Sequence, residues 1–314
     1  MEPRQLRLAA IQMVSVNGHV AENLNRAERW ATVASERGAA LVLLPELFST
    51  GFEMTAHAWE AAESQDGATE RWLAATARRH GYVIGGSYLE RRGGDYFDTF
   101  ALAGPQGIAG RVRKRHPCSM EAYIFKGGDD PHVIDTGLGR IGVAICYDSS
   151  LREVWDRLLA ESPDLLLFPM SAPTPPKTML YGQRQINAFH ASFFDGATQS
   201  ARLLGMPCAM SNKWGPWDTD LTGIIPRLIL GHQHSQFPGF THIADSDGQE
   251  VARVASGEEV AVATVRLDAS LRRLTLPPER DRFRPWIAKV PAEYHAFAAF
   301  EALGRRWYAR SKSE

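Results

Sequence analysis

The chain has 314 residues, of which 44% are hydrophobic and 23% charged, and its formal net charge is −1. This composition predicts a globular protein with a substantial core, and the near-neutral charge argues against nucleic acid or an anionic membrane as a partner. The three cysteines are irregularly spaced, which argues against a disulfide framework, and no window approaches 18 uninterrupted apolar residues. We therefore predict a cytoplasmic protein without a membrane segment.

Apolar runs of strand length alternate with helical patterns along most of the chain. This alternation is typical of an α/β fold with layered packing. Two strand–helix–strand units, residues 6–48 and 140–172, suggest an internal repeat. The expected strands lie within residues 6–13, 39–48, 82–90, 139–146, 164–172, 206–215, 239–254 and 259–268, and a hairpin over 95–116 turns at 104–107. The expected helices are 20–37, 69–81, 150–160 and 183–204, the last only if Gly196 is tolerated.

Cys146 stands between an apolar strand and an amphipathic helix. Ser150 and Glu153 match the S-x-x-E capping box, so the helix is expected to begin just after the cysteine. A helix N-terminus lowers the pKa of a nearby thiol and offers N–H groups to an oxyanion. These features favour a nucleophile, but free cysteine is also among the most buried residue types, so an inert core cysteine remains the alternative.

Glu46 ends the most apolar run of the chain, residues 41–44. A carboxylate at the end of a buried strand is desolvated and can serve as a general base, and in open α/β sheets ligands bind at the carboxyl ends of strands. The alternative is an exposed loop carboxylate in a salt bridge.

Lys114 falls on the apolar face of a predicted strand. A period of two groups it with Ile108 and Val112, and an inward lysine needs an anionic partner. The alternative is a solvated basic hairpin. The other face is expected to point its arginines to solvent: Arg111, Arg113 and Arg115.

Three motifs in this order resemble the nitrilase superfamily of carbon–nitrogen hydrolases. They are LVLLPELF around Glu46, GRVRKRHPCSMEAYIFKGGD around Lys114, and GRIGVAICYDSS around Cys146. The late segments MSNKWG and FTHIADSDGQEVA add to a likeness that spans about residues 6–268.

The resemblance implies a four-layer α-β-β-α sandwich, assembled as a homo-oligomer, and one domain over residues 1–314. It assigns Glu46 as general base, Lys114 as the cation at the tetrahedral intermediate, Cys146 as nucleophile, and Glu121 as a further carboxylate that orients Lys114 or the substrate amine. The backbone N–H of Tyr147 would share the oxyanion. The substrate would be a small amide, carbamoyl or nitrile compound, and neither a metal nor another cofactor would be needed.

The residues after Cys146 depart from the pattern of true nitrilases, which commonly have Trp-Glu there. Cys-Tyr-Asp is closer to the amidase branches, so an amide or N-carbamoyl substrate is favoured over a nitrile. Arg184 and Arg202 are predicted at the helix surface, with a substrate carboxylate as the alternative partner. Part of the divergent segment 173–226 is expected to form the pocket wall and to set specificity, because it carries Tyr181, Phe189, Phe193, Phe194, Trp214 and Trp217.

Two rival cysteine-enzyme classes lack their motifs here. No histidine has a glutamate two residues on, as a class I glutamine amidotransferase requires, and Cys146 has no G-x-C-x-G context. A non-catalytic protein that keeps the fold is the remaining alternative. The basic, proline-rich tail from Leu271 is predicted to be an arm on the surface or on a partner subunit.

Overall fold

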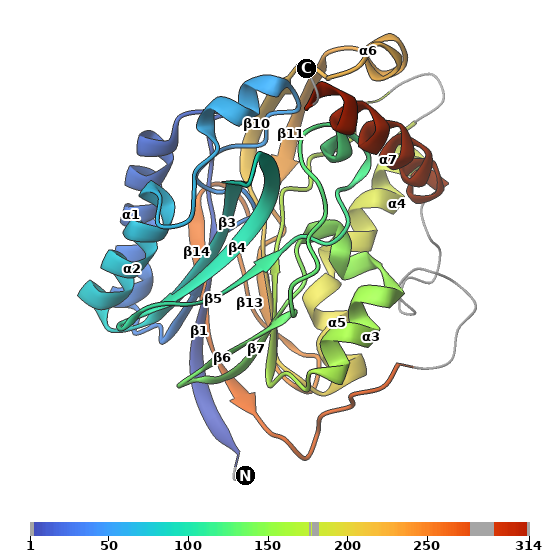
Figure 1. Ribbon diagram of the computed structural model, residues 1–314. Coiled ribbons are helices and arrows are strands. Elements are labelled where there is room, and N and C mark those ends of the chain that lie inside the picture. The colour runs from blue at the N-terminus through green and yellow to red at the C-terminus, as the bar shows by residue number, and fades with distance from the viewer. Residues whose placement is uncertain (1–2, 176, 178–181, 277–291, 313–314) are drawn as a thin grey trace.

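Two six-stranded sheets face each other in the computed structural model, which describes residues 3–175, 177, 182–276 and 292–312 (Figure 1). The first has the order β14-β1-β2-β3-β4-β5 and the second β13-β12-β9-β8-β7-β6. Their strands are β1 (Arg4–Gln12), β2 (Leu41–Leu43), β3 (Val83–Arg92), β4 (Asp95–Gly104), β5 (Gly107–Arg113) and β14 (Glu259–Leu267), then β6 (Val133–Thr136), β7 (Gly139–Val143), β8 (Leu165–Pro169), β9 (Cys208–Ser211), β12 (His242–Ala244) and β13 (Glu250–Arg253). Each sheet contains three neighbouring strands that are parallel. They are β1, β2 and β3 in the first sheet and β7, β8 and β9 in the second.

Helices cover the outer faces of both sheets. Figure 1 shows α1 and α2 against the first sheet and α3 and α5 on the opposite side of the molecule. These helices are α1 (Val20–Glu36), α2 (Ala68–His80), α3 (Arg152–Ala160), α4 (Gln183–Phe194) and α5 (Gly196–Leu204). The predicted α-β-β-α sandwich is therefore confirmed. Among the described helices, none combines the length and apolar character needed to cross a bilayer.

The strand β2 explains why the central runs are continuously apolar. Leu41 and Leu43 pack into the core between the sheets, whereas Val42 and Leu44 pack toward α1 and α2. A strand covered on both faces cannot alternate apolar with polar side chains. The continuous apolar sequence of β2 is therefore explained by its central position in a four-layer fold.

Several element boundaries differ from the sequence prediction. The strand expected over residues 39–48 contains only Leu41–Leu43, so Glu46 lies in the turn beyond it. The helix expected over 183–204 is divided at Asp195, where the chain leaves helical geometry next to Gly196, a poor helix former. The hairpin turn at 104–107 is confirmed by the pairing of Gly104 with Gly107.

Two further structural units lie at the carboxyl end of the central strands. A hairpin of β10 (Trp214–Thr219) and β11 (Gln233–Pro238) encloses the short helix α6 (Ile224–Leu230). The helix α7 (Ala292–Ser311) packs on this chain's own short helices η1 (Ala56–Ala61) and η2 (Ser119–Tyr123). The helix α7 therefore packs on the chain itself, whereas residues 277–291, which hold most of the predicted basic, proline-rich arm, lie outside the described residues.

Candidate active site

The turn that carries Glu46 is fixed by the neighbouring sheet. The Ser171 hydroxyl donates to the Glu46 carbonyl oxygen over 2.7 Å, and the Leu47 N–H donates to the Ser87 hydroxyl over 2.7 Å. Leu47 adopts a φ of 46°, in the left-handed region that branched side chains rarely occupy. The Glu46 side chain is 0% exposed, which excludes the alternative of an exposed loop carboxylate.

Lys114 directly follows β5 and points into the space between the sheets, where its side chain is fully buried. Its Nζ lies 2.7 Å from Glu46 Oε1 and 2.6 Å from Glu121 Oε2. Burial opposes the ammonium charge, but the carboxylates of Glu121 and Glu46 prevail and raise the pKa of Lys114 well above its ordinary value. Lys114 is therefore a permanent cation held between two carboxylates, and the solvated-hairpin alternative is wrong.

Glu121 lies in η2 and reaches back to the start of its own turn. Its Oε2 accepts the Cys118 N–H over 2.6 Å in addition to the Lys114 ammonium. Burial raises the pKa of Glu121 to about 7, because it outweighs the favourable charge of Lys114 while Glu46 adds to the shift. Glu121 thus fixes the direction of the Lys114 side chain.

Cys146 occupies a strained turn at the end of β7. Its φ is 46°, and residues Cys146–Ser150 form a 3-10 turn, η3, before α3 begins at Arg152. A positive φ turns the chain sharply and is a form of strain found at functional sites. The backbone of Ser171 acts to lower the pKa of the Cys146 thiol, so the thiol faces the same segment that contacts the Glu46 carbonyl oxygen.

Two expectations for this corner are wrong. Ser150 does not cap the following helix, because the 3-10 turn separates Cys146 from α3 and Glu153 instead pairs with Arg115 over 2.8 Å. The pKa of the Cys146 thiol is raised well above its ordinary value by burial and by the Glu46 charge, which outweigh Lys114. The thiol is therefore protonated at neutral pH and needs a base.

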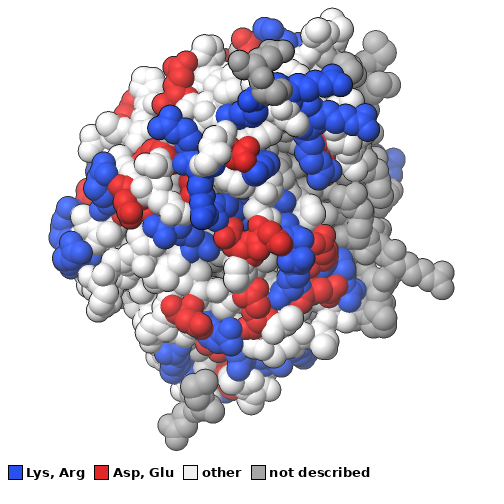
Figure 2. All heavy atoms as spheres, viewed as in Figure 1, with Lys and Arg blue, Asp and Glu red and all other residues white. Residues whose placement is uncertain are grey.

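Asp148 ties the cysteine turn to the lysine loop. Its carboxylate accepts the backbone N–H of Arg115 over 2.7 Å and that of His116 over 2.9 Å. Toward the surface, Arg115 pairs with Glu153. Figure 2 shows Lys and Arg interspersed with Asp and Glu over the visible face of the molecule. The two loops that carry Cys146 and Lys114 are thus one connected unit.

The arginines next to Lys114 do not point freely into solvent as the sequence suggested. Arg111 forms a bidentate pair with Glu70 of α2, and Arg113 is 6% exposed and forms a bidentate pair with Glu90. This face of β5 is covered, so each guanidinium is balanced by a carboxylate. The period of two holds for Val112 against Arg111 and Arg113, but Ile108 does not share the face of Val112 as predicted. A bulge between Ile108 and Gly110 shifts the register, and Ile108 packs on the side of α1 and α2.

Two buried ionisable groups near Glu46 were not identified from the sequence. Asp98 of β4 is 0% exposed and lies next to Glu46 and Ser87. Lys213 is also 0% exposed, its Nζ donates to the Leu47 carbonyl oxygen over 3.1 Å, and burial lowers its pKa to about 7. The signal for Asp98 was present, because it shares a strand face with Phe100, as Lys114 shares one with Val112.

Asp98 is expected to cost stability as the pH rises. Burial and the adjacent Glu46 charge raise its pKa well above the ordinary value, so the folded protein keeps a proton that the unfolded chain loses near pH 4. Stability is therefore lost as pH rises from about 4 toward the folded pKa, by up to about 1.4 kcal/mol per pH unit. Asp98→Asn, which keeps the neutral shape, should unfold at higher urea than the wild type at pH 7 and lose this advantage at pH 4. Equal differences at both pH values would contradict the neutral carboxyl.

A cavity of about 340 Å³ opens onto this cluster. Cys146, Tyr147, Glu121 and Ser171 form part of its lining, while Glu46 and Lys114 lie fully buried behind it. Such a volume suits a small organic ligand. A ligand in the cavity can therefore reach the Cys146 thiol.

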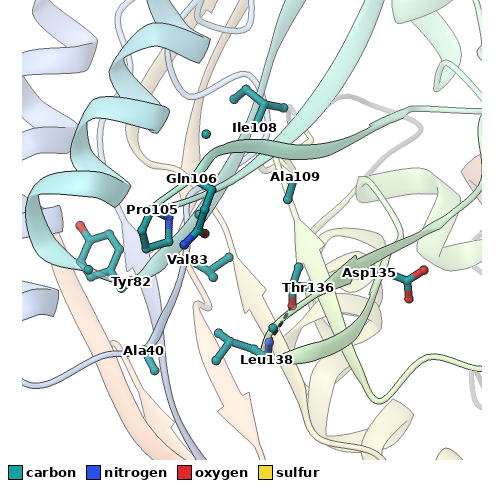
Figure 3. A pocket seen from close by; sticks show the side chains of 14 residues that line it. Ala40, Tyr82, Val83, Pro105, Gln106, Ile108, Ala109, Asp135, Thr136 and Leu138 are labelled. Atoms are coloured by element: carbon teal, nitrogen blue, oxygen red, sulfur yellow. Dashed lines mark hydrogen bonds between the residues drawn. The ribbon is translucent and has the colours of Figure 1, made fainter.

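A larger hollow, of about 520 Å³, lies at the opposite end of the parallel strands. Figure 3 shows it between the β4–β5 turn at Gln106 and the β6–β7 turn at Leu138, whose N–H donates to the Thr136 hydroxyl over 3.1 Å. The described residues of its lining include Asp135, Thr136 and Tyr82 but no cysteine, histidine, lysine or glutamate. Among the described residues, no group of three or more His, Cys, Asp or Glu is arranged to hold a metal ion. The cluster of Glu46, Lys114 and Cys146 at the other end of the strands is therefore the candidate site.

Comparison with known proteins gives the same family from sequence and structure. The sequence model of the family "Carbon-nitrogen hydrolase" matches residues 7–273. A nitrilase from Pyrococcus abyssi is 32% identical over 175 residues, which cover 54% of this chain and 67% of the relative. An omega-amidase from Bos taurus is 33% identical over 174 residues, 52% of this chain and 62% of the relative. A 2-oxoglutaramate amidase from Bacillus subtilis is 30% identical over 155 residues, 48% and 58%.

Solved structures share the fold at low sequence identity. A carbon-nitrogen hydrolase from Helicobacter pylori G27 has a TM-score of 0.66 and 20% identity, over 83% of this chain and 89% of that one. An amidase from Nesterenkonia sp. has a TM-score of 0.63 and 21% identity, over 85% and 93%. The aligned stretch spans 62% and 58% of the two amidases from Bos taurus and Bacillus subtilis, so their activities are not transferred by likeness alone. Since the family match covers most of the sequence and the two-sheet sandwich agrees with it, the chain belongs to the carbon-nitrogen hydrolase family.

Proposed function

We propose that this enzyme of the carbon-nitrogen hydrolase family hydrolyses primary amides to a carboxylic acid and ammonia through a thioester on Cys146. The observation that carries the proposal is the buried cluster of Glu46, Lys114 and Glu121 behind a thiol that lines an open cavity. One oxygen of Glu46, Oε1, is held by Lys114, and the other accepts no hydrogen bond from the described residues. Glu46 therefore has a lone pair available for a proton.

The first half of the reaction forms the thioester. Glu46 takes the proton of the Cys146 thiol, and the sulfur electron pair forms a bond to the amide carbon. The negative charge that develops on the carbonyl oxygen is stabilised by Lys114 and by the backbone N–H of Tyr147. As the C–N bond breaks, Glu46 passes its proton to the nitrogen, and ammonia leaves.

The second half returns the free enzyme. Glu46 takes a proton from a water molecule whose oxygen attacks the thioester carbon, and the C–S bond breaks as the tetrahedral intermediate collapses. Glu46 returns the proton to the sulfur, so the net reaction is amide plus water giving acid plus ammonia. Glu121 stays paired with Lys114 throughout and keeps it aimed at the oxyanion.

Ammonia release over a panel of primary amides, N-carbamoyl amino acids and nitriles tests the proposal. We expect primary amides to be hydrolysed, with Cys146→Ala at least about 1,000-fold slower because the nucleophile is gone. Mass spectrometry of the protein mixed with a good substrate should show the mass of the acyl group on Cys146. Undiminished turnover by Cys146→Ala, or ammonia only from the nitriles, would overturn it.

Several features implied by family resemblance remain predictions. They are assembly as a homo-oligomer, a cytoplasmic location, and a single domain over residues 1–314.

The amidase from Nesterenkonia sp. AN1 supports the role of the thiol, since one variant structure carries the acetamide moiety of fluoroacetamide at its active site cysteine.

A further inference from the structure

The walls of the active-site cavity are made of large apolar side chains from distant parts of the chain. Phe189 and Phe193 of α4 pack against each other with ring centroids 4.7 Å apart, and Phe297 of α7 contacts Tyr147 at 5.7 Å. Met54 and Trp217 come from the turn after β2 and from β10, and both are at most 8% exposed. The walls beyond the reacting groups are therefore preformed and largely apolar.

Two polar side chains of this wall, Gln233 and Trp217, donate to backbone carbonyl oxygens, and Gln233 Nε2 lies 2.9 Å from the Leu230 carbonyl oxygen. The indole N–H of Trp217 donates to the Phe52 carbonyl oxygen over 2.8 Å, and the two rings lie 5.6 Å apart. The Lys213 ammonium lies behind Phe52, 5.8 Å from its ring centroid, and donates to Leu47. In this part of the wall, Phe52 and Trp217 present their aromatic surfaces to a ligand.

We propose that the acyl part of the substrate is uncharged and apolar, such as a branched alkyl or an aryl-alkyl chain. This inference rests on the proposed amide hydrolysis and specifies its substrate class. Each methylene placed on such a wall is expected to improve kcat/KM about fourfold, because apolar surface leaves water. A carboxylate in the same place would lose its hydration, and the described residues that line the cavity include no lysine, arginine or histidine to pair with it.

The arginines considered as carboxylate ligands do not contribute to this wall. Arg184 is exposed on α4, and Arg202 of α5 donates to the Gly248 carbonyl oxygen on another surface. Their surface positions agree with the favoured sequence interpretation. The part of the segment 173–226 that does reach the cavity contributes aromatic rings, as predicted for Phe189, Phe193 and Trp217.

A pair of amides with the same shape but different charge tests the inference. 4-Methylpentanamide and succinamate both place two terminal atoms at the same distance from the amide, as methyl groups in one and carboxylate oxygens in the other. The wild type is expected to hydrolyse 4-methylpentanamide with a kcat/KM at least about 100-fold higher. A ratio of one or lower would overturn the inference.

A variant of the wall makes the test independent of overall activity. Phe300 of α7 lines the cavity and is half-buried, so Phe300→Arg would place a cation at its edge. The ratio between the two substrates should then shift toward succinamate by at least about tenfold. Leu228→Arg is the matched control, because Leu228 is 81% exposed on α6 and does not line the cavity, and its ratio should stay within about twofold of the wild type.

The outcomes separate this inference from the proposed function. Ammonia release that favours succinamate would leave the amidase intact and overturn only the apolar substrate class. An unchanged ratio in Phe300→Arg, with the variant still active, would likewise show that this wall does not choose the substrate. Absence of ammonia from every amide, in a folded wild type, would overturn the proposed function and the substrate class together.

Discussion

Glu46→Gln should reduce the rate of ammonia release from the best amide by about 1,000-fold. Burial and the Glu46 charge hold the pKa of the Cys146 thiol well above its ordinary value, so the thiol stays protonated unless a base removes the proton. Glutamine keeps the shape but cannot accept that proton, and general base catalysis is typically worth about 100- to 10,000-fold. The rate of the first turnover, followed by quenched-flow mass spectrometry, should fall along with steady-state kcat because acylation itself needs the base.

Glu60→Gln provides the matched control for that loss. Glu60 is 80% exposed in η1 and pairs only with His57 among the contacts seen in the described structure. The activity of the Glu60→Gln variant should therefore match that of the wild type within about twofold. A Glu46→Gln protein that folds normally and keeps more than a tenth of the wild-type rate would exclude Glu46 as the general base.

Lys114→Met should cost both activity and stability. Activity is expected to fall about 100- to 1,000-fold, because the oxyanion loses its cation. The free energy of unfolding at pH 7 should fall by about 3–5 kcal/mol, because Glu46 and Glu121 are left buried without their ammonium partner. Urea unfolding at several pH values shows whether this loss of stability grows or shrinks as the pH rises. Removing the cation raises the pKa of Glu121 above its wild-type value of about 7, so the deficit should widen as the pH rises through 7 and narrow below it.

A second variant separates the two effects of that change. Lys114→Met combined with Glu121→Gln removes one of the stranded carboxylates, so part of the stability should return while activity stays low. The surface change Lys126→Met should alter stability by less than about 1 kcal/mol, since Lys126 is half exposed. A single Lys114→Met protein as stable at neutral pH as the wild type would contradict the buried ion-pair cluster.

The fold was predictable because its central strands are apolar on both sides. Runs such as residues 41–44 are explained only by strands covered on two faces, and their alternation with helical patterns predicted the layers. The ends of elements were not predictable in the same way. The break at Asp195 and the 3-10 turn after Cys146 depend on tertiary contacts that override local propensity.

The positions of Glu46 and Lys114 were signalled by polarity where apolar residues were expected. Applied to β4, the same reasoning would have found Asp98, which stands on the face of Phe100 between the sheets. Lys213 gave a weaker signal, because it follows the short strand β9 and its partner is a backbone carbonyl oxygen that no sequence pattern specifies. The direction of the Cys146 pKa shift was missed because burial, a tertiary property, dominates it.

The cavity walls and the reacting groups have different origins in the chain. Glu46 and Cys146 follow central strands, and Lys114 follows β5, whereas the aromatic wall is supplied by α4, β10 and the terminal helix α7. Residues in the wall can therefore be substituted, and the wall elements can change in length, without moving the sheet ends that align the nucleophile with its base. During evolution, substrate specificity can therefore change independently of the catalytic groups. New acyl specificities would be reached through α4 and α7 while the sandwich is left untouched.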